Sequence, residues 1–184
     1  MKNAFILFLA LVTLSACEPK LNANQKKWVS QIDTLHYAAD TMLVAMNAVN
    51  DSLLQSQVDE IERVYKTVGL ANPDSADKRF WITEINRLEF MYSSYSKFLR
   101  DAGGIKSGLE NSQKQLEALK NSIVDSKVDS AQAEEYLNQE ARVLGELQVK
   151  FYKRQPNAKR AIVMWDTTQT HFIDLAAQVT AAKQ

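Results

Sequence analysis

Two histidines stand out first, because imidazole is a frequent metal ligand and the usual general base. Asp33 lies three residues before His36. Asp174 lies three residues after His171. This spacing places each pair on one face of a helix, so the four side chains would form a divalent-metal site if the first and last helices were neighbours. The alternative is that each histidine lies at the rim of the core and pairs with its own carboxylate.

A run of basic residues is the second candidate site. Five basic residues and no acidic residue occur between positions 150 and 160: Lys150, Lys153, Arg154, Lys159 and Arg160. Such a cluster can hold the phosphates of lipid headgroups or anionic glycans, with Phe151 or Tyr152 stacking or inserting nearby. The alternative is a solvated helix end before Pro156, where basic side chains interact favourably with the helix dipole.

The single cysteine, Cys17, follows an apolar stretch at the start of the chain. This stretch begins just after Lys2 and is too short to span a bilayer, since a spanning helix needs about 20 residues. A basic start, a short apolar core and small residues before the cysteine are typical of a secretory signal peptide. A single cysteine also excludes an internal disulfide.

The stretch Leu14-Ser15-Ala16-Cys17 matches the Leu-small-small-Cys lipobox, so the chain resembles bacterial lipoproteins. The resemblance implies that residues 1–16 are removed and that Cys17 carries a thioether-linked diacylglyceride and an N-acyl lipid. We expect no other cofactor. In this family the next residue influences sorting, and Glu18 in place of aspartate favours the outer membrane. The alternative is an ordinary signal peptide cleaved near Ala16.

Composition restricts both the partners and the fold class. The chain has 22 basic and 22 acidic residues. A nearly neutral protein lacks the positive field that nucleic-acid binding needs, so we expect no nucleic-acid partner. Five glycines and three prolines in 184 residues, with many helix-forming residues, predict an all-α protein. Residues 17–23 would be a lipidated polar tether and residues 24–184 a single helical domain.

Apolar residues recur at alternating intervals of four and three residues, which predicts helices with coiled-coil-like seams. We expect one long helix from about residue 24 to Gly69, in which the pattern shifts by one residue after Leu53. A break at residues 50–52, whose side chains can cap a helix, is the alternative. A second helix should end at Gly103-Gly104, and a third should follow to about residue 123.

A tight connection at residues 127–130 should lead into the fourth helix, with Asp129 and Gln132 at the spacing of a capping box. Pro156 should kink or end that helix, and a fifth segment should follow. Short connections favour an elongated antiparallel bundle of about five helical segments. The hairpin from residue 125 to residue 137 is similar to helical lipoproteins of Bacteroidota, a resemblance that brings no assigned activity.

No catalytic motif accompanies these helices. The sequence has no Gly-x-Ser-x-Gly elbow, and its glycine-rich stretch at residues 103–108 lacks the order of a phosphate-binding loop. We therefore expect a non-enzymatic, lipid-anchored protein of the cell envelope that binds or scaffolds another envelope component, with self-association as one form of this. The alternative is a module that binds a small ligand or a divalent metal through His36 and His171.

Overall fold

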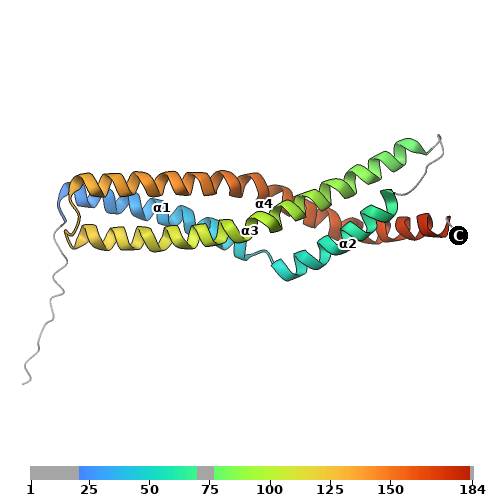
Figure 1. The fold of residues 1–184 in the computed structure, drawn as a ribbon, viewed down its shortest axis with the longest axis horizontal. Coiled ribbons are helices and arrows are strands. Elements are labelled where there is room, and N and C mark those ends of the chain that lie inside the picture. Colours follow the sequence, from blue (N-terminus) through green and yellow to red (C-terminus); the bar gives the residue numbers. More distant parts are fainter. Residues whose placement is uncertain (1–20, 70–76, 183–184) are drawn as a thin grey trace, which may run out of the picture.

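The computed structural model describes residues 21–69 and 77–182 (Figure 1). They form four helices: α1 (Ala23–Asn47), α2 (Asp51–Gly69), α3 (Lys78–Val124) and α4 (Ser130–Ala181). No strand occurs in this part of the chain, and the predicted all-α class is confirmed. Among the described helices, none is long and apolar enough to cross a membrane. The predicted signal peptide and Cys17 lie outside the described residues.

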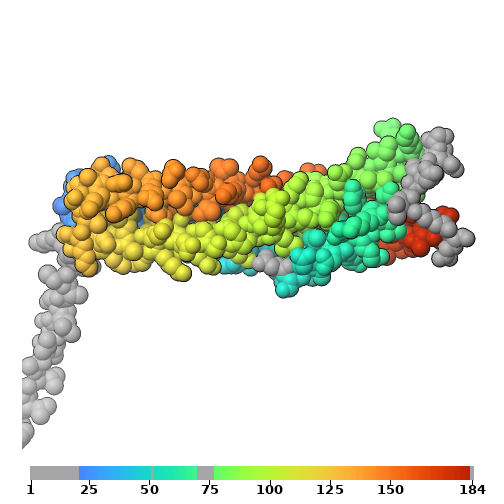
Figure 2. Space-filling model, in the orientation of Figure 1, coloured from blue at the N-terminus to red at the C-terminus, as the bar shows by residue number. Residues whose placement is uncertain are grey.

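The helices form an elongated bundle in which α3 and α4 extend along its length (Figures 1 and 2). Within the described residues, α1 and α2 each pack on α3 and α4 but not on one another. Lys120 Nζ donates to Asp33 Oδ1 at 2.8 Å. Gln113 Nε2 donates to Asp40 Oδ1 at 3.4 Å. Residue numbers therefore rise along α1 as they fall along α3, so these helices run in opposite directions.

Polar side chains link α2 to α4, which run in the same direction. Gln57 Nε2 donates to Asp166 Oδ1 at 3.4 Å. Gln169 Nε2 donates to Glu60 Oε2 at 2.7 Å. Tyr95 of α3 joins this network, because its hydroxyl donates to Gln57 Oε1 at 3.2 Å. Burial raises the pKa of the Tyr95 phenol, which keeps the hydroxyl protonated and able to donate.

Most buried residues of α3 alternate at intervals of four and three along the helix. They are Glu84, Leu88, Met91, Tyr95, Phe98, Ala102, Ile105, Leu109, Ser112, Leu116, Leu119 and Ile123. A seam with this period keeps one face of the helix buried over its whole length. The predicted helix end at Gly103-Gly104 is wrong, because packing of the seam on both sides outweighs the cost of about 1 kcal/mol for each glycine.

The predicted single helix from residue 24 to Gly69 is also wrong, because α1 and α2 are separated at residues 48–50. The alternative prediction, a break near residues 50–52, is confirmed. Asn50 caps α2, since its Oδ1 accepts a hydrogen bond from the Leu53 N–H at 3.0 Å. The break accounts for the shift in the apolar pattern: Leu53 is 56% exposed, whereas Leu54 is 2% exposed and joins the core.

Helix α4 continues through Pro156, so the described residues form four helices where we expected about five segments. Proline lacks an N–H and clashes with the preceding turn, which often ends a helix. Here Pro156 is exposed, and the carbonyl that loses its donor belongs to Tyr152, which is exposed as well. The buried residues Phe151 and Ala158 on the other side of α4 pack into the core and retain the helix.

A tight turn connects α3 to α4. The Lys127 N–H donates to the Ser122 carbonyl at 2.8 Å, and the Ser126 N–H donates to the Ile123 carbonyl at 3.1 Å. These bonds form a Schellman motif, which ends a helix with one residue in the left-handed region. That residue is Ser126, with φ of 55°. The chain therefore reverses here without a glycine.

Capping boxes begin two of the helices. The predicted box of Asp129 and Gln132 at the start of α4 is confirmed. Asn22 and Gln25 form a second box at the start of α1. Gln25 Nε2 also donates to the Ile123 carbonyl at 2.8 Å. The start of α1, the end of α3 and the start of α4 therefore lie at one end of the bundle.

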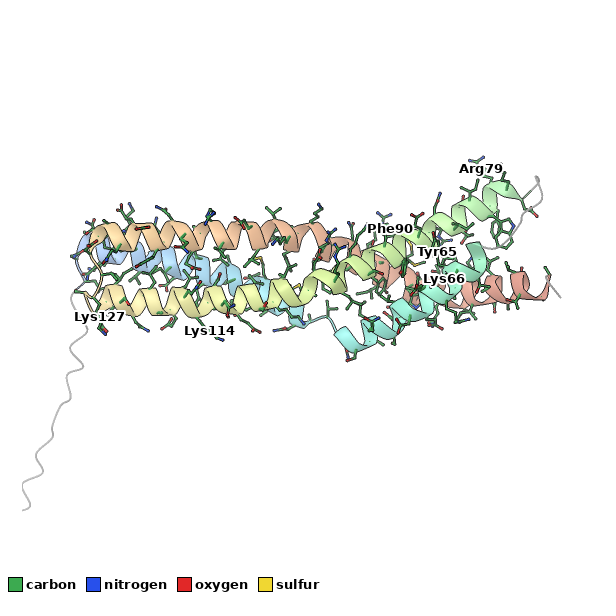
Figure 3. The ribbon with its side chains drawn as sticks, viewed as in Figure 1. Tyr65, Lys66, Arg79, Phe90, Lys114 and Lys127 are labelled. Carbon is green, nitrogen blue, oxygen red and sulfur yellow. The ribbon has the colours of Figure 1, made fainter. Side chains whose placement is uncertain are left out.

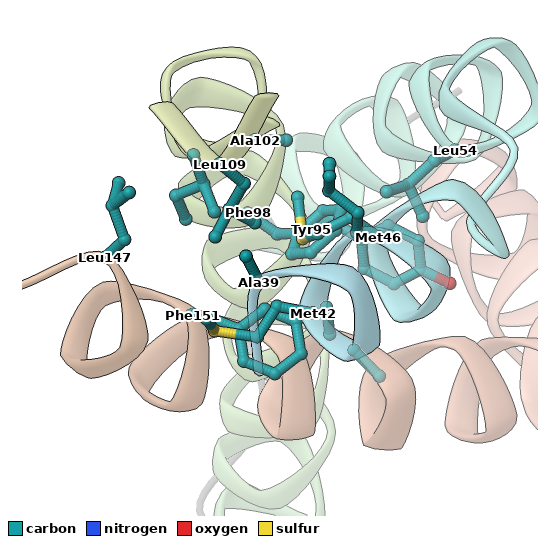
Figure 4. Close-up of a cluster of buried hydrophobic side chains, with 14 of the residues drawn as sticks. Ala39, Met42, Met46, Leu54, Tyr95, Phe98, Ala102, Leu109, Leu147 and Phe151 are labelled. Atoms are coloured by element: carbon teal, nitrogen blue, oxygen red, sulfur yellow. The ribbon is translucent and has the colours of Figure 1, made fainter. Parts of the chain in front are cut away.

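The middle of the bundle is a core to which all four helices contribute (Figure 4). Met46 of α1, Leu54 of α2 and Tyr95 of α3 are each at most 2% exposed there, and Phe151 of α4 is 5% exposed. Full burial of a large apolar side chain stabilises the fold by about 1.5–3 kcal/mol. This junction joins the half of the bundle that contains α1 to the half that contains α2.

Candidate functional site

A groove lined by basic residues lies between α3 and α4, near the middle of the bundle. Its volume is about 500 Å³. Its charged lining residues are Arg100, Asp101, Lys150, Lys153 and Arg154. The remaining lining residues are Gly104, Ile105, Leu147 and Val149. We call this surface the basic groove.

The two helical seams position the charged side chains of the basic groove. Arg100 and Asp101 come just before the buried seam residue Ala102 of α3. Lys150 and Lys153 lie close to the buried Phe151 of α4. Because α3 and α4 pack along these seams, residues beside the seams meet at the edge of the helix interface. A Cβ atom at Gly104 would have no neighbour within 4 Å in the described part of the chain, so this wall of the groove is open.

Asp101 is the one acid among the described residues that line the basic groove. Arg100 Nε donates to Asp101 Oδ1 at 2.8 Å. Arg154 Nε, from the facing helix, donates to Asp101 Oδ2 at 2.7 Å. Hydrogen bonds from Arg100 and then from Arg154 lower the pKa of Asp101 to about 2, so the carboxylate is ionised at neutral pH. With four bases around one carboxylate, the basic groove keeps a positive charge.

Within residues 21–69 and 77–182, no acid pairs with Lys150 or Lys153. Lys153 and Arg154 also line an adjoining groove of about 220 Å³, to which Lys97 contributes a further positive charge. The two grooves therefore form one positively charged surface. It can bind phosphate or carboxylate groups, because lysines act as mobile point charges and arginines present several N–H donors in a fixed plane.

Three of the five basic residues in the predicted cluster line the basic groove: Lys150, Lys153 and Arg154. Arg160 has another role, since its guanidinium lies 5.2 Å from the centroid of the Phe90 ring. Lys159 is exposed and is not part of the lining. The predicted cluster is therefore divided between the groove and the neighbouring surface of α4.

Sequence reasoning did not identify Lys97, Arg100 and Asp101 as site residues. They lie about fifty residues before the basic cluster, and the packing of α3 on α4 brings them to it. One signal was present in the sequence. Asp101 and Arg154 lie equally far before and after the turn at residues 127–128, so an antiparallel hairpin places them opposite each other.

The four side chains that we considered as metal ligands do not converge: Asp33, His36, His171 and Asp174. Asp33 pairs with Lys120, whereas His171 Nε2 lies 3.1 Å from Glu84 Oε2. The described residues contain no group of three or more histidine, cysteine or acidic side chains able to hold a metal ion. From the end where both helices begin, His36 lies about 20 Å along α1 and His171 about 60 Å along α4, at 1.5 Å per residue.

His171 belongs instead to a polar cluster near the other end of the bundle. Glu84 is 6% exposed, and both of its carboxylate oxygens accept hydrogen bonds from Arg87 at 3.0 Å. Glu84 also contacts His171, which lines a cavity of about 410 Å³ together with Asp174. His171 therefore has a carboxylate partner, as in the alternative interpretation, but the partner comes from α3 and not from its own helix.

No protein-family model matches this chain, and comparisons with curated proteins and with solved structures found no significant match. The chemistry of the basic groove is therefore the main guide to function.

Proposed function

We propose that this chain is a lipid-anchored, non-enzymatic protein of the cell envelope whose helical bundle binds an anionic envelope component in the basic groove. The observation that carries the proposal is the meeting of four basic residues from two helices around a cavity of about 500 Å³. Asp101, the acid among the described lining residues, is already held by two arginines. The lysines are therefore the groups that meet a ligand's negative charge.

The anchor part of the proposal rests on Leu14-Ser15-Ala16-Cys17. In this proposal residues 1–16 are removed, Cys17 carries the diacylglyceride and the N-acyl chain, and Glu18 favours retention at the outer membrane. Cells that express the full chain should incorporate radioactive palmitate into it, and the Cys17→Ser variant should remain unlabelled. Equal labelling of the two proteins would refute the anchor.

The bundle suits a binding or scaffolding role, and we propose that it acts as an elongated antiparallel support with coiled-coil-like seams. A second copy of the chain is the other partner considered. However, the buried α1 residues Trp28, Ile32 and Met42 pack within a core shared with α3 and α4. An α1 seam that is covered within its own chain supports an external envelope component as the partner, and not a second copy.

Calorimetric titration with inorganic pyrophosphate tests binding at the basic groove. The protein is the full chain with Cys17→Ser, which cannot take the lipid. Adding Lys150→Glu and Lys153→Glu should weaken pyrophosphate binding by at least about tenfold, which corresponds to about 1.4 kcal/mol. The matched control carries Lys27→Glu and Lys114→Glu, two exposed lysines outside the groove. Lys114 lies on α3 well away from Phe90, which lines the adjoining groove (Figure 3). Equal affinity of the two variants would contradict the proposal.

A further inference from the structure

We propose that the anion bound by the basic groove belongs to the phospholipid headgroups of an anionic bilayer, against which the outer face of α4 lies. This inference rests on the proposed function and names the ligand of the same site. It requires two features beside the groove, an exposed apolar surface that enters the headgroup region and an excess of positive charge around it. Helix α4 has both.

The apolar feature is a ridge on the outer face of α4. Val149 is 68% exposed, Tyr152 is 58% exposed and Val163 is 64% exposed. Pro156 lies between them in sequence and is exposed as well. At about 100° per residue, these four side chains fall within an arc of about 60° on the helix surface. We call them the α4 ridge. Val149 also lines the basic groove, so the ridge and the groove are continuous.

The charge along the α4 ridge is positive. From Leu147 to Trp165 the sequence contains five basic residues and no acidic one, and the nearest acids of α4, Glu146 and Asp166, lie just beyond the two ends of the ridge. Lys153 follows Tyr152 directly, and Lys159 lies between Pro156 and Val163 in sequence. An apolar stripe bordered by basic side chains is the pattern of helices that lie in the interface of anionic membranes. A small soluble anion would need the basic groove but would gain nothing from the ridge.

Helix α1 provides an internal comparison. Its outer residues Tyr37 and Val44 are 74% and 64% exposed, much like Tyr152 and Val163. Between residues 28 and 47 the sequence contains two acidic residues and no lysine or arginine, and Lys120 of α3 pairs with one of the acids, Asp33. Helix α1 therefore gives its exposed apolar residues no basic border, and an anionic bilayer would attract the face of α4 instead. Exposed apolar residues of the same types therefore differ in what they can dock against.

The positions of the helix ends are compatible with a bundle whose α4 face lies on the membrane. Helices α1 and α4 begin at the same end of the bundle. The proposed lipid on Cys17 is attached six residues before the start of α1. The α4 ridge begins about 30 Å along α4 from that end, at 1.5 Å per residue. A bundle that lies along the membrane, and does not stand upright on it, brings the ridge to the headgroups.

Cosedimentation with vesicles tests this inference. The parent protein is the full chain with Cys17→Ser, mixed with vesicles of phosphatidylcholine alone or of phosphatidylcholine with phosphatidylglycerol. The ridge variant adds Tyr152→Ser and Val163→Ser, the ridge residues that do not line the basic groove. The control variant adds Tyr37→Ser and Val44→Ser to the parent. All proteins share the same N-terminal residues, so the contribution of residues 1–20 cancels between them. Pyrophosphate affinity is measured for each protein in parallel.

We expect the parent and the control variant to bind the anionic vesicles equally, and the ridge variant to bind them at least about tenfold less tightly. All three should bind pyrophosphate alike. If the ridge variant binds anionic vesicles as the parent does, or if the parent does not prefer them to neutral vesicles, the bilayer is not the ligand. A soluble or glycan-borne anion then remains for the groove. If Lys150→Glu with Lys153→Glu leaves pyrophosphate affinity unchanged, the proposed function itself fails.

Discussion

Arg154 of α4 and Asp101 of α3 are joined across the basic groove by a hydrogen bond of 2.7 Å between Nε and Oδ2. Arg100 holds the other carboxylate oxygen of Asp101 at 2.8 Å. The pair ties the two long helices together beside the cavity. It also places one negative charge among the basic residues that we propose bind an anion.

Replacing Asp101 should affect both ligand affinity and acid stability. In Asp101→Asn the groove loses its carboxylate, so pyrophosphate should bind more tightly, by a factor of about 3–10. The native pKa of Asp101 is about 2, below its unfolded value. The ion pair therefore contributes stability above about pH 4, and this contribution is lost as the pH falls towards 2. Thermal melts at pH 7 and pH 2 measure it.

At pH 7, Asp101→Asn should lower the free energy of unfolding by no more than about 1 kcal/mol, because the pair is partly exposed. At pH 2 the variant and the parent should be nearly equal in stability. Asp33→Asn is the matched control, since Asp33 forms a similar interhelical pair with Lys120 outside the basic groove. A rise in pyrophosphate affinity in Asp33→Asn as large as in Asp101→Asn would show that the effect is not local.

Glu140 is a buried acid in the interface between α3 and α4. It is 7% exposed, and among the described residues neither Oε2 of Glu140 nor the hydroxyl of Ser112 has a hydrogen-bond partner with good geometry. Burial raises the pKa of Glu140, and the nearby Ser112 offsets only part of this. A raised native pKa means that the folded state holds the proton more strongly. Stability therefore falls as the pH rises through the native pKa.

Glu140→Gln should therefore be more stable than the parent at pH 7, because it places no charge in this site. A gain of about 1 kcal/mol would raise the melting temperature by about 2–4 °C in a chain of this size. The gain should shrink as the pH falls below the unfolded pKa of glutamate. Glu135→Gln, at an exposed position of the same helix, should change the melting temperature little. A loss of stability in Glu140→Gln at pH 7 would contradict this account.

Two glycines within α3 should respond differently to alanine. At Gly103 a Cβ atom would have no neighbour within 4 Å among residues 21–69 and 77–182. Gly103→Ala should therefore stabilise the helix by about 0.5–1 kcal/mol. At Gly108 the Cβ atom would lie 2.8 Å from Leu147 Cδ2, so Leu147 must shift. Gly108→Ala should stabilise less or destabilise. Equal melting temperatures for the two variants would contradict the close approach of α3 and α4 at Gly108.

A further effect on stability is expected at the turn between α3 and α4. Ser126 has φ of 55°, where any residue with a Cβ atom is strained. Ser126→Gly should raise the free energy of unfolding by about 1 kcal/mol relative to Ser126→Ala. Both variants lose the hydrogen bond that Gln25 Nε2 donates to Ser126 Oγ. The difference between them therefore measures the cost of the left-handed backbone conformation at residue 126. Chemical denaturation of the two variants measures the difference.

The sequence predicted the helical class and the start of α4 because these depend on local signals. Asp129 and Gln132 form the expected capping box, and most buried residues of α3 follow the predicted period of four and three. The sequence failed at Gly103-Gly104, and of the two alternatives at Pro156 the helix end is wrong, because tertiary packing outweighs the local propensity against the helix. Seam positions occupied by Ala102 and Ser112 had no apolar signal, so the continuity of α3 was not visible.

The candidate site was predictable only in part, because it combines residues of two helices. Lys150, Lys153 and Arg154 belong to one helix and were found from the local excess of basic residues. Arg100 and Asp101 lie on another helix, and their role depends on the register of the hairpin. The metal hypothesis failed because spacing within a helix does not report the distance between helices. His36 and His171 lie at very different heights in the bundle.

The most direct test of the account is to locate the bound anion by NMR. Inorganic pyrophosphate is titrated into the isotopically labelled full chain with Cys17→Ser, and shifts of backbone amides are followed. Anion binding in the basic groove predicts that the largest shifts fall at residues 100–105 and 147–154, where its lining residues lie. Largest shifts elsewhere, such as beside His171 or at the turn near residue 127, would contradict it.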